Sequence, residues 1–135
     1  MAEERERAQM ARQHVFVVNG HPDILELLRV LFQREEYNVT TTNFVPQTFE
    51  QIEALQPSVL IVDLVVGQRA GWELLERLHQ GARTRGIPVV LFSTDPRLLE
   101  AAKADPARYG GDAFLSKPFD IEDMLQTVER LIGTA

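Results

Sequence analysis

The stretch VFVVNGHPDILELL, residues 15–28, places a short apolar run directly before a helical pattern. Residues 15–18 are β-branched or aromatic, as is typical of a strand buried on both faces of a parallel sheet. The run ends at Asn19-Gly20, and Pro22 then suits the first turn of a helix. Apolar side chains recur along this helix at the i, i+3, i+4, i+7 spacing, at Ile24, Leu27, Leu28 and Leu31. The stretch therefore predicts a buried strand joined to a helix by a short polar turn.

The same alternation of strand and helix continues along the rest of the chain. Further strand patterns lie at 37–42, 59–62, 89–92 and 113–115. Further helical patterns lie at 46–55, at 72–80, after Asp95-Pro96 and after Asp120, the last two with an aspartate as the expected cap. This alternation predicts an α/β protein of (βα)5 type, in which a doubly wound parallel sheet carries helices on both faces. Pro106 cannot sit inside a helix without breaking it, so the fourth helix is expected to end irregularly.

Composition limits the class of protein. The chain has 135 residues, enough for one domain with a sizeable core. We expect a polar tail over residues 1–13 and one domain over residues 14–133. A net charge of -6 argues against nucleic acid and an anionic membrane as partners, because both need clustered Lys and Arg. The lack of cysteine excludes disulfides, thiolate metal sites and a cysteine nucleophile. The first residues have no apolar signal segment, and a cytoplasmic location is expected.

Each apolar run is followed by residues that can carry chemistry. In a doubly wound sheet, ligands bind outside the carboxyl ends of the strands. Those ends are followed by Asn19 and Gly20, by Asp63, by Ser93 and Thr94, and by Ser116 and Lys117. A carboxylate, hydroxyls and an ammonium group can together hold a phosphoryl group, because the carboxylate can accept it and the others can bind its oxygens. Singly, each residue also fits a plain role as a cap, a turn residue or a solvated lysine.

Three segments, in order on this pattern, resemble the receiver domain of the bacterial response regulators. They are LIVDLVVGQRAGWELLERL (60–78), IPVVLFST (87–94) and AFLSKPF (113–119). The resemblance covers about residues 14–133 and implies a flavodoxin-like fold with strand order 2-1-3-4-5. It gives Asp63 the role of phosphoacceptor, with Ser93 and Lys117 binding the phosphoryl oxygens. Ser93 and Phe114 fall at the positions of the family's switch residues.

The resemblance also implies a role in two-component phosphorelay signal transduction. The expected partners are a sensor histidine kinase or phosphotransfer protein and a downstream protein target. We expect a stand-alone domain that signals by protein–protein interaction and is not itself an enzyme. A homodimer through the helix after Pro96, the strand at 113–115 and the helix after Asp120 is a further option.

The candidate site departs from the family at Asn19-Gly20, where the family carries an acidic pair that holds magnesium beside the phosphoacceptor. Magnesium is bound mainly by carboxylates, phosphate oxygens and water, whereas Asn19 offers a neutral oxygen and Gly20 no side chain. A metal site made by Asp63, Asn19 and the main-chain carbonyl of Val65 is therefore expected to be weak or absent. Asp63 is instead expected to form a salt bridge with Lys117, with an attraction of a few kcal/mol at ~3–4 Å before desolvation is subtracted.

Two smaller departures, and one arginine, lie near Asp63. Thr94 stands where the family usually has a small residue, so access to the carboxylate is expected to be narrower. Gly67 replaces a common proline, so the loop GQRAG (67–71) is expected to be more flexible than usual. Arg69 in this loop is interpreted as a solvated side chain, with a contact to phosphate or to Asp63 as the alternative.

Two other functions stay open at this point. A degenerate receiver would act as a phosphorylation-independent binding or dimerisation module, with Asp63 and Lys117 kept as a satisfied ion pair. A flavodoxin-like enzyme or nucleotide-binding protein would need a phosphate-cradling loop, and neither G-x-G-x-x-G nor G-x-x-x-x-G-K-[ST] occurs. A dehalogenase-type phosphatase would need a second aspartate where Val65 stands. Phosphoacceptor signalling is therefore the preferred function.

Overall fold

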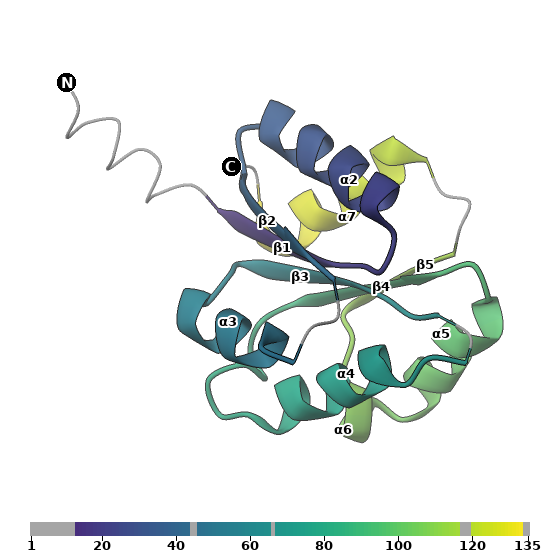
Figure 1. Ribbon diagram of the computed structural model, residues 1–135. Helices are drawn as coiled ribbons and strands as arrows, with labels where there is room; N and C mark the ends of the chain where they lie inside the picture. The colour runs from purple at the N-terminus through teal and green to yellow at the C-terminus, as the bar shows by residue number, and fades with distance from the viewer. Residues whose placement is uncertain (1–12, 44–45, 66, 117–119, 134–135) are drawn as a thin grey trace.

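The computed structural model describes residues 13–43, 46–65, 67–116 and 120–133. These residues form a sheet of five strands with helices on both faces (Figure 1). The strands are β1 (His14–Val18), β2 (Asn38–Thr42), β3 (Val59–Asp63), β4 (Val89–Ser93) and β5 (Ala113–Ser116). The helices are α2 (Pro22–Arg34), α3 (Thr48–Leu55), α4 (Ala70–Gln80), α5 (Pro96–Ala104), α6 (Pro106–Tyr109) and α7 (Ile121–Ile132).

The sheet has the strand order β2-β1-β3-β4-β5, and each strand is parallel to its neighbours. This result confirms the expected doubly wound, flavodoxin-like fold. The chain first moves outward from β1 to β2 and then returns across β1 to β3. The carboxyl ends of β1 and β3 therefore lie at the topological switch point, where open α/β sheets bind their ligands.

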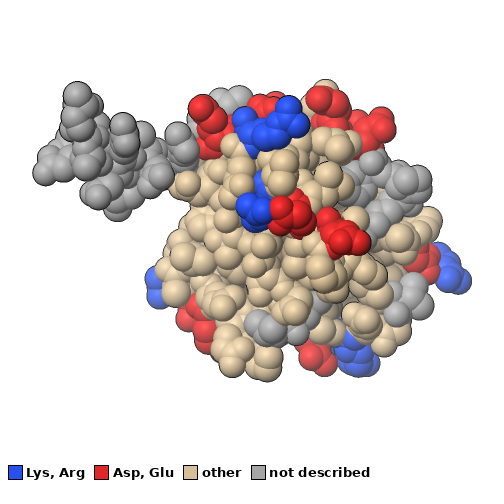
Figure 2. Space-filling view, turned by 45° about the horizontal axis from the view of Figure 1, so that its top comes forward, with Lys and Arg blue, Asp and Glu red and all other residues tan. Residues whose placement is uncertain are grey.

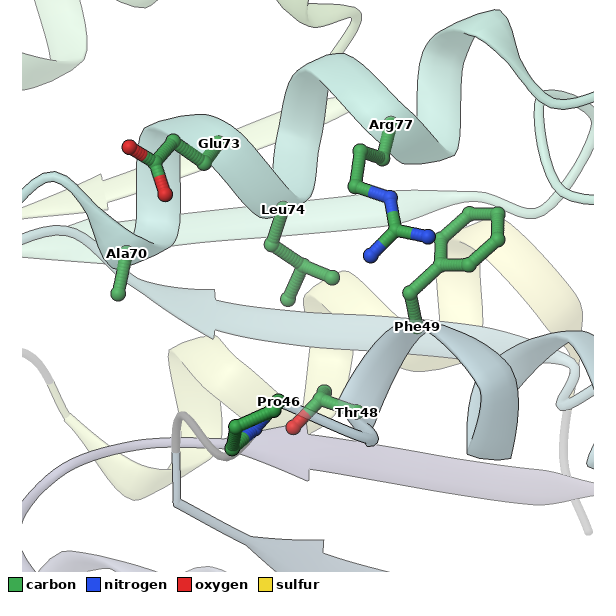
Figure 3. Close-up of a pocket in the computed structure, with 7 residues that line it drawn as sticks. All are labelled: Pro46, Thr48, Phe49, Ala70, Glu73, Leu74 and Arg77. Carbon is green, nitrogen blue, oxygen red and sulfur yellow. The ribbon is translucent and has the colours of Figure 1, made fainter.

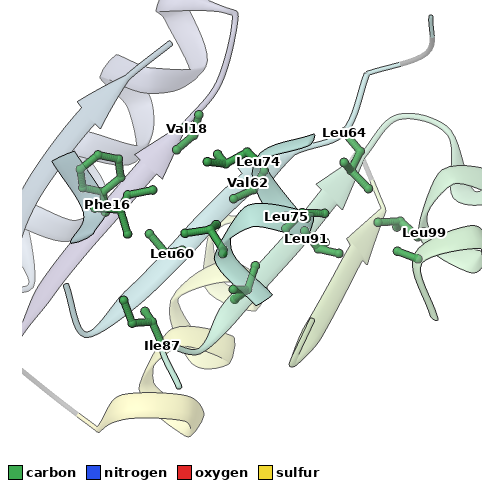
Figure 4. Close-up of a cluster of buried hydrophobic side chains, with 14 residues drawn as sticks. Phe16, Val18, Leu60, Val62, Leu64, Leu74, Leu75, Ile87, Leu91 and Leu99 are labelled. Atoms are coloured by element: carbon green, nitrogen blue, oxygen red, sulfur yellow. The ribbon is translucent and has the colours of Figure 1, made fainter. Parts of the chain in front are cut away.

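Strand side chains alternate between two cores, one on each face of the sheet. Phe16 of β1 belongs to the core beneath α3, α4 and α5, where it lies in one cluster with Leu75 (Figure 4). Val17, the next residue, faces the opposite core with Phe32 of α2 and Met124 of α7. All five side chains are at most 1% exposed. Full burial of such a side chain contributes about 1.5–3 kcal/mol to folding, which explains why the strands read as continuous apolar runs.

Most helix boundaries follow the local sequence. The side chain of Asp95 caps α5 by accepting a hydrogen bond of 2.9 Å from a main-chain N–H of the first turn. Pro106 begins the separate short helix α6, which confirms the irregular end expected for the fourth helix. Asp120 occupies the expected N-cap position of α7, but its side chain makes no capping hydrogen bond. Its main-chain carbonyl accepts the N–H of Asp123 at 3.0 Å, and its side chain stays exposed.

Candidate functional site

Three polar residues lie buried at the carboxyl edge of the sheet. Asp63 is the last residue of β3, Ser93 is the last residue of β4, and Asn19 directly follows β1. Asn19 and Ser93 are fully buried, and Asp63 is 2% exposed. Burying polar groups is unfavourable unless each finds a partner, so a cluster of them at the switch point marks a candidate site. The structure thus brings together three of the residues that the sequence singled out.

Asp63 is held by the register of β3 against its neighbours. Its alternation with Val59 and Ile61 places its side chain on the face covered by α2 and α7. Position 63 pairs with Phe92 of β4. Lys117, the expected partner of the Asp63 carboxylate, lies outside the described residues, so the salt bridge between them stays a prediction.

Asn19 closes a tight turn with its own side chain. The Asn19 Oδ1 atom accepts a hydrogen bond of 2.7 Å from the main-chain N–H of His21, and the Asn19 N–H donates to the carbonyl of Thr42 at 3.0 Å. This side-chain-to-backbone arrangement is an Asx turn, which guides the chain from β1 into α2. The amide oxygen that the sequence offered as a weak metal ligand is therefore already used within the turn.

The described residues do not fit a magnesium site of the family's kind. Gly20 contributes no side chain, and the carbonyl of Val65 accepts a hydrogen bond of 3.2 Å from the Gln68 N–H. Across the described ranges, no three His, Cys, Asp or Glu side chains are grouped so that they could hold a metal ion. Asp63 would be the single carboxylate ligand, whereas magnesium sites in proteins rely on carboxylates and substrate phosphates.

The hydroxyl of Ser93 is engaged with the main chain of two loops. Ser93 Oγ donates a hydrogen bond of 2.7 Å to the carbonyl of Leu64 and accepts one of 3.1 Å from the N–H of Asp95. Ser93 can bind a phosphoryl oxygen at Asp63 only after it gives up one or both of these bonds. Sequence patterns do not point to Leu64, because its part in the site is played by a main-chain carbonyl.

Phe114, the expected second switch residue, is half-buried in β5 and packs against the core on the side of α5. The Nζ atom of Lys103 lies 5.1 Å from the centroid of the Phe114 ring. Gly111 also lies against the ring: a Cβ atom at that position would lie 3.0 Å from Phe114 Cζ. Phe114 therefore has its own packed position between α5 and the start of β5.

The loop after Asp63 is open to solvent. The side chain of Arg69 is 84% exposed and lies 3.8 Å from Glu73, as expected for a solvated arginine. Thr94 is also exposed. Gly67 has a φ of +77°, a conformation that proline cannot adopt because its ring fixes φ near −65°. A proline at position 67 would therefore force this loop into a different conformation.

Two surface grooves flank α4. One, of 270 Å³, lies between α3 and α4; Figure 3 shows Phe49 and Leu74 lining it, with the Arg77 guanidinium 4.2 Å from the Phe49 ring centroid. The other, of 510 Å³, borders the loop after β3, with the rings of Trp72 and Tyr109 packed edge to face at 4.7 Å. Neither groove is lined by the buried polar residues at the ends of β1, β3 and β4.

The surface carries mixed charge. On the face that Figure 2 shows, acidic and basic side chains are interspersed, and no extended basic patch gathers there. The helices that the structure describes all lack the length and apolar character needed to cross a lipid bilayer.

The fold and the site together define a class of protein. A parallel sheet of this order is also the fold of the solved chemotaxis protein CheY4 of Vibrio cholerae, which matches with a TM-score of 0.76 and 22% identity over 90% of this chain and 99% of that chain. The family model of the response regulator receiver domain matches residues 15–129. The chain belongs to this family and is a receiver of two-component signalling.

Individual relatives agree with this assignment. The chain is 26% identical over 124 residues to the DNA-binding dual master transcriptional regulator RpaA of Synechocystis, covering 87% of this chain and 48% of that protein. It is 24% identical to Protein PilH of Pseudomonas aeruginosa, covering 92% of this chain and 99% of that protein. The chain spans about half the length of several curated relatives that it matches.

Solved structures show the same fold. One is the receiver domain of a sensor histidine kinase from Pseudomonas aeruginosa, which holds a magnesium ion in its active-site cleft. It matches with a TM-score of 0.76 and 18% identity, over 92% of this chain and all of that domain. The two chains thus share one fold at low sequence identity.

Proposed function

We propose that this receiver accepts a phosphoryl group on Asp63 from a sensor histidine kinase or phosphotransfer protein and signals through contacts with a protein target. The observation that carries the proposal is the position of Asp63. It ends the central strand β3, is 2% exposed, and lies between the buried polar residues that follow β1 and end β4. Burying a carboxylate here is unfavourable unless it has a binding partner. The topological switch point is where doubly wound sheets bind their ligands, so a ligand is a natural partner for this carboxylate.

The transfer is a substitution at phosphorus. An Asp63 carboxylate oxygen attacks the phosphorus of a phosphohistidine, the new P–O bond forms, and the P–N bond breaks. The bonding electrons remain on the imidazole nitrogen, which the donor protein keeps, and Asp63 becomes an acyl phosphate. Hydrolysis by water later restores the carboxylate and releases inorganic phosphate. In this scheme the receiver is a phosphoacceptor with no further enzymatic activity, and transfer takes place in the cytoplasm.

Ser93 connects phosphorylation of Asp63 to a change in the surface that contacts the target. Its hydroxyl bonds the Leu64 carbonyl and the Asp95 N–H in the resting state. Rotation of this hydroxyl toward a phosphoryl oxygen releases the loops that lead from β3 and into α5. The face made by α5, β5 and α7 then repacks around Phe114. This face is the proposed surface for the protein target or for a second copy of the chain.

The similarity to Protein PilH, which the chain covers almost completely, supports action as a single domain. Relatives such as the transcriptional regulator RpaA are about twice as long as the matched region. Output through a partner protein is therefore proposed for the domain itself.

A second function is favoured by a specific observation. Both Asn19 Oδ1 and Ser93 Oγ already have main-chain partners, so these two oxygens are engaged without a phosphoryl group or a metal ion. A receiver of this kind can work as a phosphorylation-independent binding or dimerisation module.

Incubation of the chain with acetyl phosphate, followed by intact-mass spectrometry and peptide mapping, separates the two functions. Phosphoacceptor function requires a phosphoryl adduct on Asp63 that is lost in Asp63→Asn. Asp23→Asn, at an exposed aspartate in the first turn of α2, is the matched control and should leave the adduct unchanged. An unmodified parent, with a control receiver modified in parallel, would favour the phosphorylation-independent module.

A further inference from the structure

The Asn19 amide has a defined orientation. An asparagine side chain presents an oxygen acceptor at one end and an N–H donor at the other. The main-chain N–H of His21 can only donate, and it lies 2.7 Å from the Asn19 side chain. The end that faces His21 must therefore be the oxygen, and the Nδ2 donor group must face away from the turn.

This Nδ2 group is buried without a hydrogen-bond acceptor among the described residues. Asn19 is 0% exposed, so bulk water does not serve as its partner. Leaving a buried donor unsatisfied costs about 1–3 kcal/mol, and native proteins rarely keep such groups without a reason. An acceptor supplied by a ligand would satisfy it.

Strand register places this donor beside Asp63. Val18 of β1 pairs with Val62 of β3, so the next residues, Asn19 and Asp63, follow on neighbouring strands and on the same face of the sheet. Neighbouring strands lie about 5 Å apart, within reach of a ligand bound between the two side chains. The unsatisfied donor and the candidate phosphoacceptor thus share one buried edge.

We propose that Asn19 Nδ2 donates a hydrogen bond to an oxygen of the phosphoryl group carried by Asp63. The inference rests on the proposed phosphoacceptor function and adds a binding residue to it. An N–H group repels a cation and attracts anionic oxygen, so this position recognises the phosphoryl anion directly. The acidic pair of the family acts in the opposite sense, because its carboxylates need a cation between themselves and the phosphoryl group.

Binding of the phosphoryl group is consequently independent of magnesium to a large degree. Removing one donor of an oxyanion site typically costs about 100- to 1,000-fold in rate where that donor is fully used. For Asn19 we expect a loss of at least about 10-fold in affinity for a phosphoryl analogue.

Beryllofluoride, an analogue of the phosphoryl group, tests the proposal by fluorine NMR in magnesium-depleted buffer. Asn19→Asp is the sharpest variant, because the carboxylate keeps an acceptor for the His21 N–H and replaces only the donor. Asn19→Ala removes both groups. Asn43→Asp makes the same chemical change at an exposed asparagine beyond β2 and serves as the matched control.

We expect a beryllofluoride adduct in the parent and in Asn43→Asp without magnesium, and at least about 10-fold weaker binding in both Asn19 variants. Nitrogen NMR of the parent gives a second test that needs no variant, because the Asn19 side-chain amide signals should shift when the adduct forms. Equal binding by Asn19→Asp and the parent, or an unshifted amide, overturns the inference.

The same experiment separates this inference from the proposed function. An adduct in the parent that forms only with magnesium overturns the role of Asn19 and leaves Asp63 as phosphoacceptor. No adduct under either condition overturns both.

Discussion

The hydroxyl of Ser93 donates a 2.7 Å hydrogen bond to the main-chain carbonyl of Leu64, the residue that directly follows Asp63. The same hydroxyl accepts the N–H of Asp95, which caps α5. One buried side chain therefore joins the loop after β3 to the start of the helix on the proposed signalling face. Any movement of this hydroxyl toward Asp63 changes both loops at once.

Substitution Ser93→Ala should destabilise the fold by about 1–3 kcal/mol, because a buried carbonyl and an N–H both lose their partner. Urea unfolding followed by circular dichroism measures this change. The matched control is Ser116→Ala, at the residue that pairs with Ser93 on β5 but is exposed. The control should stay within about 0.5 kcal/mol of the parent. Equal stability of the two variants would show that the Ser93 bonds contribute little.

Substitution Gly67→Pro, which restores the family's usual residue, should also destabilise the protein. Gly67 has a φ of +77°, whereas the proline ring requires about −65°, so the loop would have to rearrange. We expect a loss of at least about 1 kcal/mol by thermal or urea unfolding. Gly20→Ala is the control, since Gly20 has no positive φ and a Cβ there meets nothing within 4 Å. A neutral Gly67→Pro would mean that the loop adopts the family conformation in solution.

The sequence allowed the sheet, its strand order and the buried ends of β1, β3 and β4 to be predicted. Apolar runs mark the strands directly, and strands of a parallel sheet end at one edge, so Asp63 and Ser93 were expected to meet there. The hydrogen bonds of Ser93 and Asn19 could not be predicted in the same way. The partners are the Leu64 carbonyl and the His21 N–H, and side-chain patterns carry no signal for a main-chain group.

Helix boundaries show the same limit. The helix expected around 72–80 begins at Ala70 in the structure. Its start was missed in the sequence because Gly71, although buried in α4, adds no apolar side chain to the helical pattern. Asp120 is the N-cap of α7 as expected, but its side chain makes no capping bond, since the choice between such a bond and solvent depends on local geometry. The ion pair of Asp63 with Lys117 stays a prediction.

His14 should make stability depend on pH. Burial lowers the pKa of His14 below its ordinary value of 6.5, and its Nε2 lies 2.7 Å from Thr40 Oγ1. The unfolded chain therefore takes up a proton at a higher pH than the folded chain. The stability contribution is complete above pH 6.5 and is lost as the pH falls through the folded-state pKa. Urea unfolding from neutral to mildly acidic pH should show this decline, and His14→Gln should reduce its slope. An unchanged slope would assign the decline to other groups.

Magnesium binding should be weak in the parent and should appear when carboxylates are restored after β1. The single tryptophan, Trp72 of α4, packs against Tyr109 of α6 and reports on the loop that follows Asp63. A fluorescence titration of the parent should show no saturation at millimolar magnesium, because Asn19 offers a donor and Gly20 no ligand.

The double variant Asn19→Asp, Gly20→Asp should bind magnesium with a saturable change of the same fluorescence. A Cβ atom at Gly20 would meet nothing within 4 Å, so the added carboxylate has room. Magnesium is usually bound through one or two carboxylates together with water, and the two added side chains supply carboxylate ligands that the parent lacks after β1. Gly86→Asp adds the same charge at another glycine with open space and should leave the titration flat. Tight binding by the parent would contradict the reading of Asn19 as a donor, and a flat titration of the double variant would place the obstacle outside these two residues.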